Sequence, residues 1–248
     1  MGTSYVARAN PDGYTIGYAI GALTINQAIR ANIPYDLTRD FVCITQCTHL
    51  TGYPLVANAS FPADTLAGVI ALAKKSPSPI MYASPGPGRN GHMIGLLIEQ
   101  KTGIKLQHVP YNGSAPALTD VLAGRVPLMI DVWISVQPHV DAGKLKVIAL
   151  TNTKRMPGYD FPTVSETVPG AGMDSIQGVI APAKTPKKIV DKLAHDIGEV
   201  MNEPEMVARI RPMGIEPVRS SPAEYRAKIL AEFEEWKRIS AEGGGKIE

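Results

Sequence analysis

Cysteine is scarce in this sequence, and both cysteines, Cys43 and Cys47, lie in one apolar segment. If that segment is a strand, residues four apart share a face and are separated by roughly 13 Å. A disulfide requires Cα atoms within about 7 Å of each other. We therefore expect two buried, unpaired thiols. Only His49 is near enough in sequence to join them as a ligand, so the segment does not predict a zinc site.

The charged residues lack a dominant sign, and long apolar runs are missing. The 25 basic and 23 acidic residues give a formal net charge of +2. No basic run stands out, which disfavours binding to nucleic acid or to a membrane surface. No stretch of about 20 apolar residues predicts a transmembrane helix. The first 13 residues contain no apolar core, so we expect no signal peptide in this chain.

The sequence does have enough apolar material for a sizeable core, since 44% of its 248 residues are hydrophobic and 19% are charged. Short apolar stretches alternate with segments of helical periodicity, which is typical of a doubly wound α/β fold. Thr185, as an N-cap followed by proline at N1, and a capping box of Ser221 and Glu224 predict two further helix starts. The predicted strands are 14–20, 41–48, 54–57, 80–84, 106–110, 127–131 and 145–150, and the predicted helices between them are 23–31, 65–75, 91–102, 115–123 and 136–142.

The stretch SPGPGRNGH (84–92) contains three glycines with the G-x-G-x-x-G spacing of dinucleotide-binding loops. It follows a predicted strand and precedes a predicted helix, as such a loop must. A dinucleotide fold also needs an acidic residue at the end of the next strand, where this chain has Tyr111. Two prolines further remove backbone donors from the loop. The stretch therefore does not predict a nucleotide site, and we expect no cofactor.

A glycine loop that opens a helix still directs free backbone N–H groups toward one point, where any anion, a carboxylate included, is stabilised. A helix N-terminus contributes about 0.3–1 kcal/mol to a bound charge. We expect ligand contacts from the Ser84 hydroxyl and from the backbone at Gly86, Gly88 and Asn90. The alternative is an ordinary tight turn between strand and helix. His92 either faces the ligand or packs at the turn, and we expect its imidazole to be neutral.

Two longer blocks, YASPGPGRNGH (82–92) and HVPYNGSAPALTD (108–120), resemble the receptors of the tripartite tricarboxylate transporter family, also called Bug or TctC solute-binding proteins. Shorter matches to that family are PDGYT (11–15), PYD (34–36), DF (40–41), Gly124, Asp131, GKL (143–145), PTV (162–164), AP (181–182) and TP (185–186). Each match alone is weak, but their order across nearly the whole chain makes the resemblance specific.

The resemblance implies an α/β type II periplasmic-binding-protein fold, in which two doubly wound lobes close on a small carboxylate in a central cleft. It further implies a periplasmic, non-catalytic receptor that delivers its ligand to the membrane permease subunits of the transporter. We expect the chain to cross between lobes near Asn58 and near Ser175, so that residues 1–57 and 175–248 form lobe 1 and residues 58–174 form lobe 2.

One departure from the family pattern concerns its usual opening, a signal peptide followed by a strand and a proline- and glycine-rich loop that holds one end of the ligand. This chain begins after that segment, just before PDG (11–13). We therefore expect lobe 1 to be N-terminally truncated, with exposed sheet edges that favour a homodimer. Two alternative functions stay open: a structural or partner-binding module with impaired ligand binding, and an enzyme that uses His92 and Asp131 as acid and base.

Further candidate site residues follow from position. Asp131 ends a predicted strand, where α/β sheets bind ligands; we expect it to accept a hydrogen bond from a ligand amine or hydroxyl or to orient water, unless it caps the next helix. Trp133 either walls the pocket or packs in the core. The other candidates are Tyr111 and Gly113, which contact ligand or shape a turn, Gly21, Ala22 and Thr24 in a loop of lobe 1, and Gln177 at the second crossing.

Overall fold

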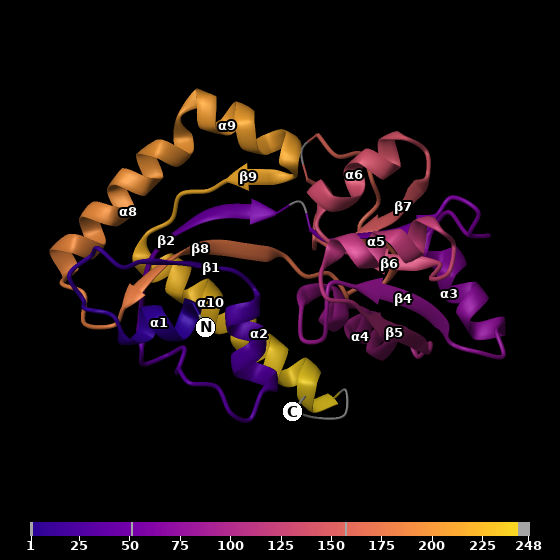
Figure 1. Ribbon diagram of the computed structural model, residues 1–248, viewed down its shortest axis with the longest axis horizontal. Helices are drawn as coiled ribbons and strands as arrows, with labels where there is room; N and C mark the ends of the chain where they lie inside the picture. Colours follow the sequence, from indigo (N-terminus) through magenta and orange to yellow (C-terminus); the bar gives the residue numbers. More distant parts are fainter. Residues whose placement is uncertain (1, 51, 157, 243–248) are drawn as a thin grey trace. The chain divides into compact units, whose positions relative to one another are not determined.

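The computed structural model describes residues 2–50, 52–156 and 158–242. Contacts within the chain divide it into two compact units (Figure 1). Unit 1 comprises Met1–Leu50 and Ser175–Glu248, and unit 2 comprises Thr51–Asp174. The sequence prediction assigned residues 1–57 to lobe 1. In the structure, the strand that covers 54–58 pairs inside the sheet of unit 2.

Unit 1 is built on a four-stranded sheet with the order β1-β8-β2-β9, in which neighbouring strands run antiparallel. Apolar clusters cover both faces of this sheet: α1, α2 and α10 contribute to one, and α8 to the other. The strands are β1 (Gly17–Ala19), β2 (Phe41–Leu50), β8 (Ser175–Pro182) and β9 (Ile215–Pro217). The helices are α1 (Gly2–Arg8), α2 (Ala22–Ile29), α8 (Lys187–Asn202), α9 (Pro204–Ile210), a short 3₁₀ helix (Arg211–Met213) and α10 (Pro222–Glu242).

Strand β2 supplies side chains to the clusters on both faces of this sheet. Its pairing with β8 contains register shifts between Cys43 and Thr45 and between Gln46 and Thr48. A bulge inserts one extra residue into a strand and changes the face that the following side chains occupy. Cys43 therefore packs in the cluster of α2 and α10, and Cys47 packs in the cluster of α8.

Both cysteines are buried and free, as predicted. Burial raises the pKa of each thiol to about 11, which leaves both protonated and poorly nucleophilic at neutral pH. The expectation that Cys43 and Cys47 share one face of the strand is wrong, because strict alternation fails at the bulges of β2.

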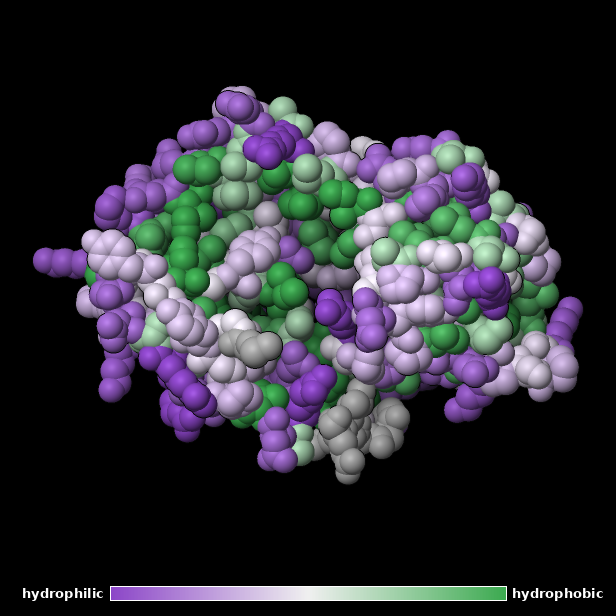
Figure 2. Space-filling model, in the orientation of Figure 1, coloured by the Kyte–Doolittle hydropathy of each residue, from purple (hydrophilic) through white to green (hydrophobic). Residues whose placement is uncertain are grey.

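Helix α8 is amphipathic: its outward face is hydrophilic, and hydrophobic side chains gather on its inner side (Figure 2). The helix begins at Lys187, and Pro186 occupies the N-cap position. The predicted cap by Thr185 is wrong, because its hydroxyl instead donates to the Pro182 carbonyl oxygen over 2.7 Å.

The predicted capping box at the start of α10 is confirmed. Glu224 N donates to Ser221 Oγ over 3.2 Å, and Ser221 N donates to Glu224 Oε2 over 2.8 Å. This reciprocal pair satisfies amide groups that a helix N-terminus otherwise leaves unpaired. It fixes the start of the longest helix of unit 1, which packs against α2 and β2.

Unit 2 is built on a five-stranded sheet with the order β5-β4-β6-β3-β7. Strand β4 runs parallel to β5 and β6, and β3 runs antiparallel to β6 and β7. The strands are β3 (Pro54–Asn58), β4 (Ile80–Ser84), β5 (Leu106–Pro110), β6 (Leu128–Ile130) and β7 (Leu145–Leu150). The helices are α3 (Leu66–Lys75), α4 (Asn90–Thr102), α5 (Ser114–Leu122), α6 (Trp133–Asp141) and α7 (Val164–Thr167).

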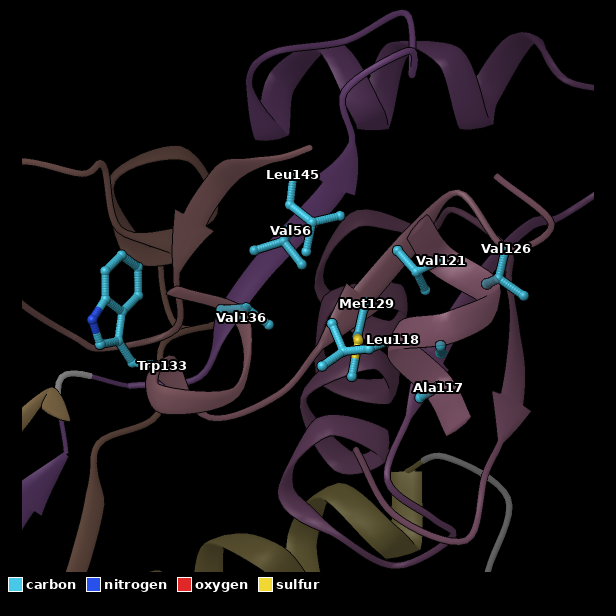
Figure 3. Packing of buried hydrophobic residues seen from close by; sticks show 10 residues of the cluster. Val56, Ala117, Leu118, Val121, Val126, Met129, Trp133, Val136 and Leu145 are labelled. Carbon is cyan, nitrogen blue, oxygen red and sulfur yellow. The ribbon is translucent and has the colours of Figure 1, made fainter. Parts of the chain in front are cut away.

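An apolar cluster in unit 2 joins β3, β4 and β6 to α5 and α6 (Figure 3). Trp133 lies at one end of this cluster and Val126 at the other. The Trp133 side chain makes an edge contact with Tyr159, with ring centroids 5.2 Å apart, and a tilted contact with Phe161 at 5.6 Å. The cluster therefore fixes the start of α6, because Trp133 is the first residue of that helix.

The predicted strands at 80–84, 106–110 and 145–150 are confirmed with the same bounds. The helix predicted at 136–142 instead begins at Trp133 and ends at Asp141. In the part of the chain that the structure describes, no helix is both long and apolar enough to span a bilayer.

Candidate functional site

The carboxyl ends of three parallel strands meet at one edge of the sheet in unit 2. In the pairing of β4 with β5, Ser84 lies opposite Pro110, and β6 flanks β4 on its other side. The segments that follow these strands, 85–89, 111–113 and 131–132, lead into the N-termini of α4, α5 and α6. Ligands of α/β proteins bind at such an edge.

Two glycines allow α4 to lie directly on the sheet. A Cβ atom at Gly91 would collide with the carbonyl oxygen of Ile130 and lie 3.2 Å from the Cβ of Ser84. A Cβ atom at Gly95 would collide with the phenol of Tyr82. The first turn of α4 is therefore held against the ends of both β4 and β6.

The backbone N–H groups at the start of α4 are available to a ligand. The helical ladder begins with the bond that Met93 N donates to Arg89 O over 3.1 Å, so the amides of Asn90, Gly91 and His92 precede it. Backbone donors that precede the helical ladder, together with the helix dipole, stabilise a bound anion.

The loop residues before α4 use their polar groups to shape the loop. Gly86 N donates to Ser84 Oγ over 3.3 Å, and Gly88 N donates to His92 Nδ1 over 3.2 Å. Tyr111 N donates to Ser84 O over 3.1 Å. The structure thus engages the predicted donors at Ser84, Gly86 and Gly88 within the loop, and the amides left for an anion lie one turn further along, at 90–92.

His108, which the sequence prediction of the site did not include, lies beneath this loop. Its Nε2 is 2.7 Å from Ser84 Oγ, and its ring stacks on that of His92 with centroids 4.2 Å apart. His108 is the first residue of the block HVPYNGSAPALTD and lies on a strand parallel to 80–84. Aligning the two predicted strands would have placed His108 opposite Tyr82, which is its position in the structure.

Both imidazoles are neutral at neutral pH. Burial lowers the pKa of His92, and burial together with the neighbouring His92 lowers the pKa of His108 to about 4. Because His92 Nδ1 accepts a hydrogen bond from Gly88 N, its proton lies on Nε2. The burial of the His92 ring is therefore consistent with the neutral imidazole expected at a helix N-terminus.

Asp131 lies where the N-termini of α4, α5 and α6 come together. It directly follows β6, is 3% exposed, and accepts a hydrogen bond at Oδ1 from Val132 N over 2.8 Å. Burial raises the pKa of the Asp131 carboxyl, whereas a hydrogen bond from the Ser114 side chain at the start of α5, the hydrogen bond from the Val132 amide and the charge of Arg89 before α4 lower it. Val132, not Asp131, occupies the N-cap position of α6.

Three buried polar atoms near this edge have no hydrogen-bond partner among the described residues: Asn90 Nδ2, Asp131 Oδ2 and Trp133 Nε1. Asn90 is the first residue of α4 and is 7% exposed. An unsatisfied buried polar atom costs about 1–3 kcal/mol, and such atoms in native proteins call for an explanation such as a water or an ion. The edge therefore offers an unused side-chain donor at the start of α4, beside an Asp131 carboxyl on which the Ser114 side chain and the Val132 amide act.

Tyr111 and Gly113 shape the loop between β5 and α5. Tyr111 Oη donates to Asp120 Oδ2 over 2.7 Å, and Gly113 N donates to Pro85 O over 3.1 Å. Gly113 has a φ of 112°, which side-chain-bearing residues rarely adopt. Burial and the Asp120 carboxylate raise the pKa of Tyr111 to about 12. These contacts tie the β5–α5 loop to the loop before α4.

The remaining predicted residues, Gly21, Ala22, Thr24 and Gln177, belong to unit 1. Gly21 is the N-cap of α2, and Ala22 is its first residue. Gln177 Oε1 accepts a hydrogen bond from Tyr18 Oη over 2.8 Å, and Tyr18 Oη is also 2.7 Å from Thr48 Oγ1. Gln177 therefore belongs to a polar group on β1, β2 and β8.

The hydroxyl of Thr24 is engaged inside unit 1. It lies 2.9 Å from Gly21 O and 3.1 Å from Glu232 Oε2. Glu232, on α10, is 8% exposed. Burial raises the pKa of its carboxyl to about 7, against the opposing effects of Thr24 and Trp236.

The Glu232→Gln variant is expected to lose one component of the pH dependence of stability. Because the pKa of Glu232 is raised from 4.5 to about 7 on folding, its contribution is full below pH 4.5 and is lost as pH rises through 7. The loss amounts to roughly 3 kcal/mol. Urea denaturation at pH 4.5 to 8 should show a flatter profile for the variant, with exposed Glu205→Gln as control. Parallel profiles for wild type and Glu232→Gln would contradict the assignment.

The chemistry available at the edge in unit 2 is the binding of a polar or anionic group. Ser84 and His108 pair a hydroxyl with an imidazole, as nucleophilic sites do, but Ser84 is 0% exposed. In the described ranges, no group of three or more His, Cys, Asp or Glu side chains is arranged to hold a metal ion.

Comparisons with known proteins agree with this architecture. The chain matches the family described as tripartite tricarboxylate transporter family receptor over residues 1–244. A UPF0065 protein of Bordetella bronchiseptica is 31% identical over 236 residues, which span 94% of this chain and 70% of the relative.

Two solved structures are similar to this chain over almost its whole length. An R. palustris protein solved with adipate is 30% identical, with a TM-score of 0.88 over 98% of this chain and 82% of that chain. The periplasmic binding protein BugD is 28% identical, with a TM-score of 0.85 over 98% of this chain and 83% of its own. They confirm the expected periplasmic-binding-protein fold. The chain belongs to the tripartite tricarboxylate transporter family of receptors.

Proposed function

We propose that this protein is an extracytoplasmic solute-binding receptor that captures a small carboxylate at the edge formed by β4, β5 and β6. The observation that carries the proposal is the convergence of three helix N-termini there, with the amides of 90–92 ahead of the helical ladder. Oriented amides and helix dipoles stabilise an anion without requiring a cationic side chain.

The relatives support a carboxylate as the ligand and the periplasm as the compartment. The R. palustris structure holds adipate, and BugD is described as a periplasmic binding protein. By the same family relation, the receptor delivers its ligand to the membrane permease subunits of a tripartite transporter. Micromolar affinity requires only about −8 kcal/mol, which several amide and hydroxyl contacts can supply.

A receptor is favoured over an enzyme by the state of the nearest hydroxyl and imidazole groups. Ser84 is fully buried and its hydroxyl is shared between His108 and Gly86. The pair proposed as acid and base, His92 and Asp131, consists of a neutral imidazole bonded to Gly88 N and a carboxyl bonded to Val132 N. These groups hold the loops in place, which suits binding.

The wild-type protein is expected to bind at least one dicarboxylate of four to six carbons with micromolar affinity. Isothermal titration calorimetry would measure this with adipate and its shorter homologues. Ligand at one hundred times its Kd should raise the free energy of unfolding by about 2.7 kcal/mol. Diamides of the same chain lengths are the control, because they keep the shape and lose the charge. A folded protein that binds the acids and the diamides equally would contradict recognition of the carboxylate charge, and one that binds neither set would contradict capture of dicarboxylates of this length.

A further inference from the structure

We infer that two copies of this chain associate through β1, with the two β1 strands antiparallel and side by side, so that the sheet of unit 1 continues from one protomer into the other. The homodimer expected from the sequence thereby gains a definite surface. This surface belongs to unit 1, and its use does not depend on carboxylate capture in unit 2.

Strands β1 and β9 lie at opposite ends of the sheet of unit 1 (Figure 1). In the part of the chain that the structure describes, β1 pairs with β8 alone, through residues 17–19. Its other side therefore presents backbone N–H and C=O groups that no strand occupies. Such an edge pairs with another chain unless proline, charge or a covering segment prevents it.

The two ends of this sheet differ in how they are protected. Strand β9 ends at Pro217, which has no backbone N–H, and its Glu216 is paired with Arg211 over 3.2 Å. Between Asp12 and Arg30, by contrast, the sequence contains neither a proline nor a charged residue. We therefore expect β1 to pair with its own copy rather than with β9. Two identical edges close on a two-fold axis, whereas β1–β9 pairing would continue into a filament.

The segment 14–20 carries an apolar stripe beside this edge. Exposure alternates along the segment, and Ala19, between two exposed residues, packs in the cluster of α2 and α10. Because side chains two apart share a face of an extended chain, the exposed ones lie together on the opposite face. Four large apolar side chains form this stripe and are 43–94% exposed: Tyr14, Ile16, Tyr18 and Ile20.

A second copy of the chain matches this stripe. When two identical edges pair antiparallel, the same face of each sheet lies on the same side, so the two stripes meet. Aromatic and β-branched side chains form favourable cross-strand pairs, and no like charges are brought together. Tyr18 is already ordered, because its Oη donates to Gln177 Oε1 over 2.8 Å, so association costs little side-chain entropy there. A charged partner would find no complementary charge on the stripe.

The exposed apolar area sets the strength of this association. A groove of about 480 Å³, lined by α1, β1 and the start of α2, borders the same strand, and Tyr5 on its α1 side is also exposed. Because an aromatic side chain buries 150–250 Å², Tyr5, Tyr14 and Tyr18 together offer roughly 300–550 Å² per chain. Standard interfaces bury about 800 Å² per partner. We therefore expect a dimer with a Kd on the order of 10 µM.

Sedimentation velocity of the wild-type chain over about 1–200 µM tests the association and should show a monomer–dimer equilibrium. Raising the salt concentration from about 0.05 to 0.5 M should change the Kd by less than about threefold, because screening has no charged pair to weaken. A dimer held by charged surfaces would instead dissociate under the same change.

Lysine substitutions locate the interface. Ile16→Lys places like charges beside the two-fold axis and should weaken dimerisation at least about tenfold. Tyr14→Lys, at a side chain that is almost fully exposed, should weaken it without disturbing packed groups. Val200→Lys on α8 is the matched control, since Val200 and Ile16 are 44% and 43% exposed, and it should keep the wild-type Kd. Circular dichroism establishes that each variant is folded.

Three results would overturn the inference. One is a wild-type chain that stays monomeric over the whole concentration range. Another is a dimer that Tyr14→Lys and Ile16→Lys leave intact, or that Val200→Lys weakens equally, because the interface would then lie elsewhere. The third is growth beyond the dimer, which would indicate pairing of β1 with β9. Tyr14→Lys decides the location even if Ile16→Lys does not fold, and each result stands whether or not a carboxylate binds.

Discussion

The Gly91→Ala variant is expected to bind carboxylates about ten- to thirtyfold more weakly than wild type and to lose about 2–3 kcal/mol of unfolding free energy. The added Cβ would collide with the Ile130 carbonyl oxygen, a backbone atom of β6 that cannot move aside alone, and would crowd the Cβ of Ser84. The first turn of α4 would have to lift from β6, which misdirects the amides of 90–92. Calorimetric titration and urea denaturation measure the two effects.

Gly103→Ala at the other end of α4 is the matched control. Gly103 has a φ of 71° and open space around its Cα, so alanine there strains the backbone without a collision. That variant should lose about 1 kcal/mol and keep wild-type affinity. If Gly91→Ala bound ligand as well as wild type, the start of α4 would not be the anion-binding element.

Trp133→Ala is expected to destabilise unit 2 by about 3–5 kcal/mol, because it removes a large side chain from the cluster that joins the sheet to α6. Trp133 is 6% exposed and packs against Tyr159 and Phe161. Thermal or urea denaturation would measure the loss. Trp133→Phe, which keeps an aromatic ring, should lose much less.

The same variant decides between the two roles open for Trp133. As a core residue, it should change ligand affinity by less than about threefold under conditions where Trp133→Ala remains folded. A loss of about tenfold or more in folded protein would instead show that the indole forms part of the ligand pocket. Measurements at low temperature, with circular dichroism as the check of folding, keep the two effects apart.

Local patterns in the sequence were sufficient to predict most elements of unit 2. The strands at 80–84, 106–110 and 145–150 are short apolar runs with clear breaks on both sides, and their bounds are confirmed. The helix at 133–141 begins earlier than predicted, because Trp133 and Ile134 were not recognised as helical. No helix is predicted before PDG (11–13), where the structure has α1 at Gly2–Arg8.

The chemistry of the candidate site was less accessible from the sequence, because hydrogen-bond partners come from distant segments. Ser84 was predicted as a ligand donor, but its hydroxyl meets His108, which lies 24 residues away on the neighbouring strand. Thr24 similarly meets Glu232, which lies 208 residues away. A polar residue at the right edge of a sheet can be found from the pattern, whereas its free or engaged state depends on three-dimensional packing.

The burial of β2 on both faces also determines how unit 1 can unfold locally. One strand of ten residues carries side chains of the cluster under α10 and of the cluster under α8. Neither helical layer can lose this strand without exposing the apolar surface of the other. The two layers are therefore linked into one cooperative unit for local unfolding, with Cys43 and Cys47 as markers on its opposite sides.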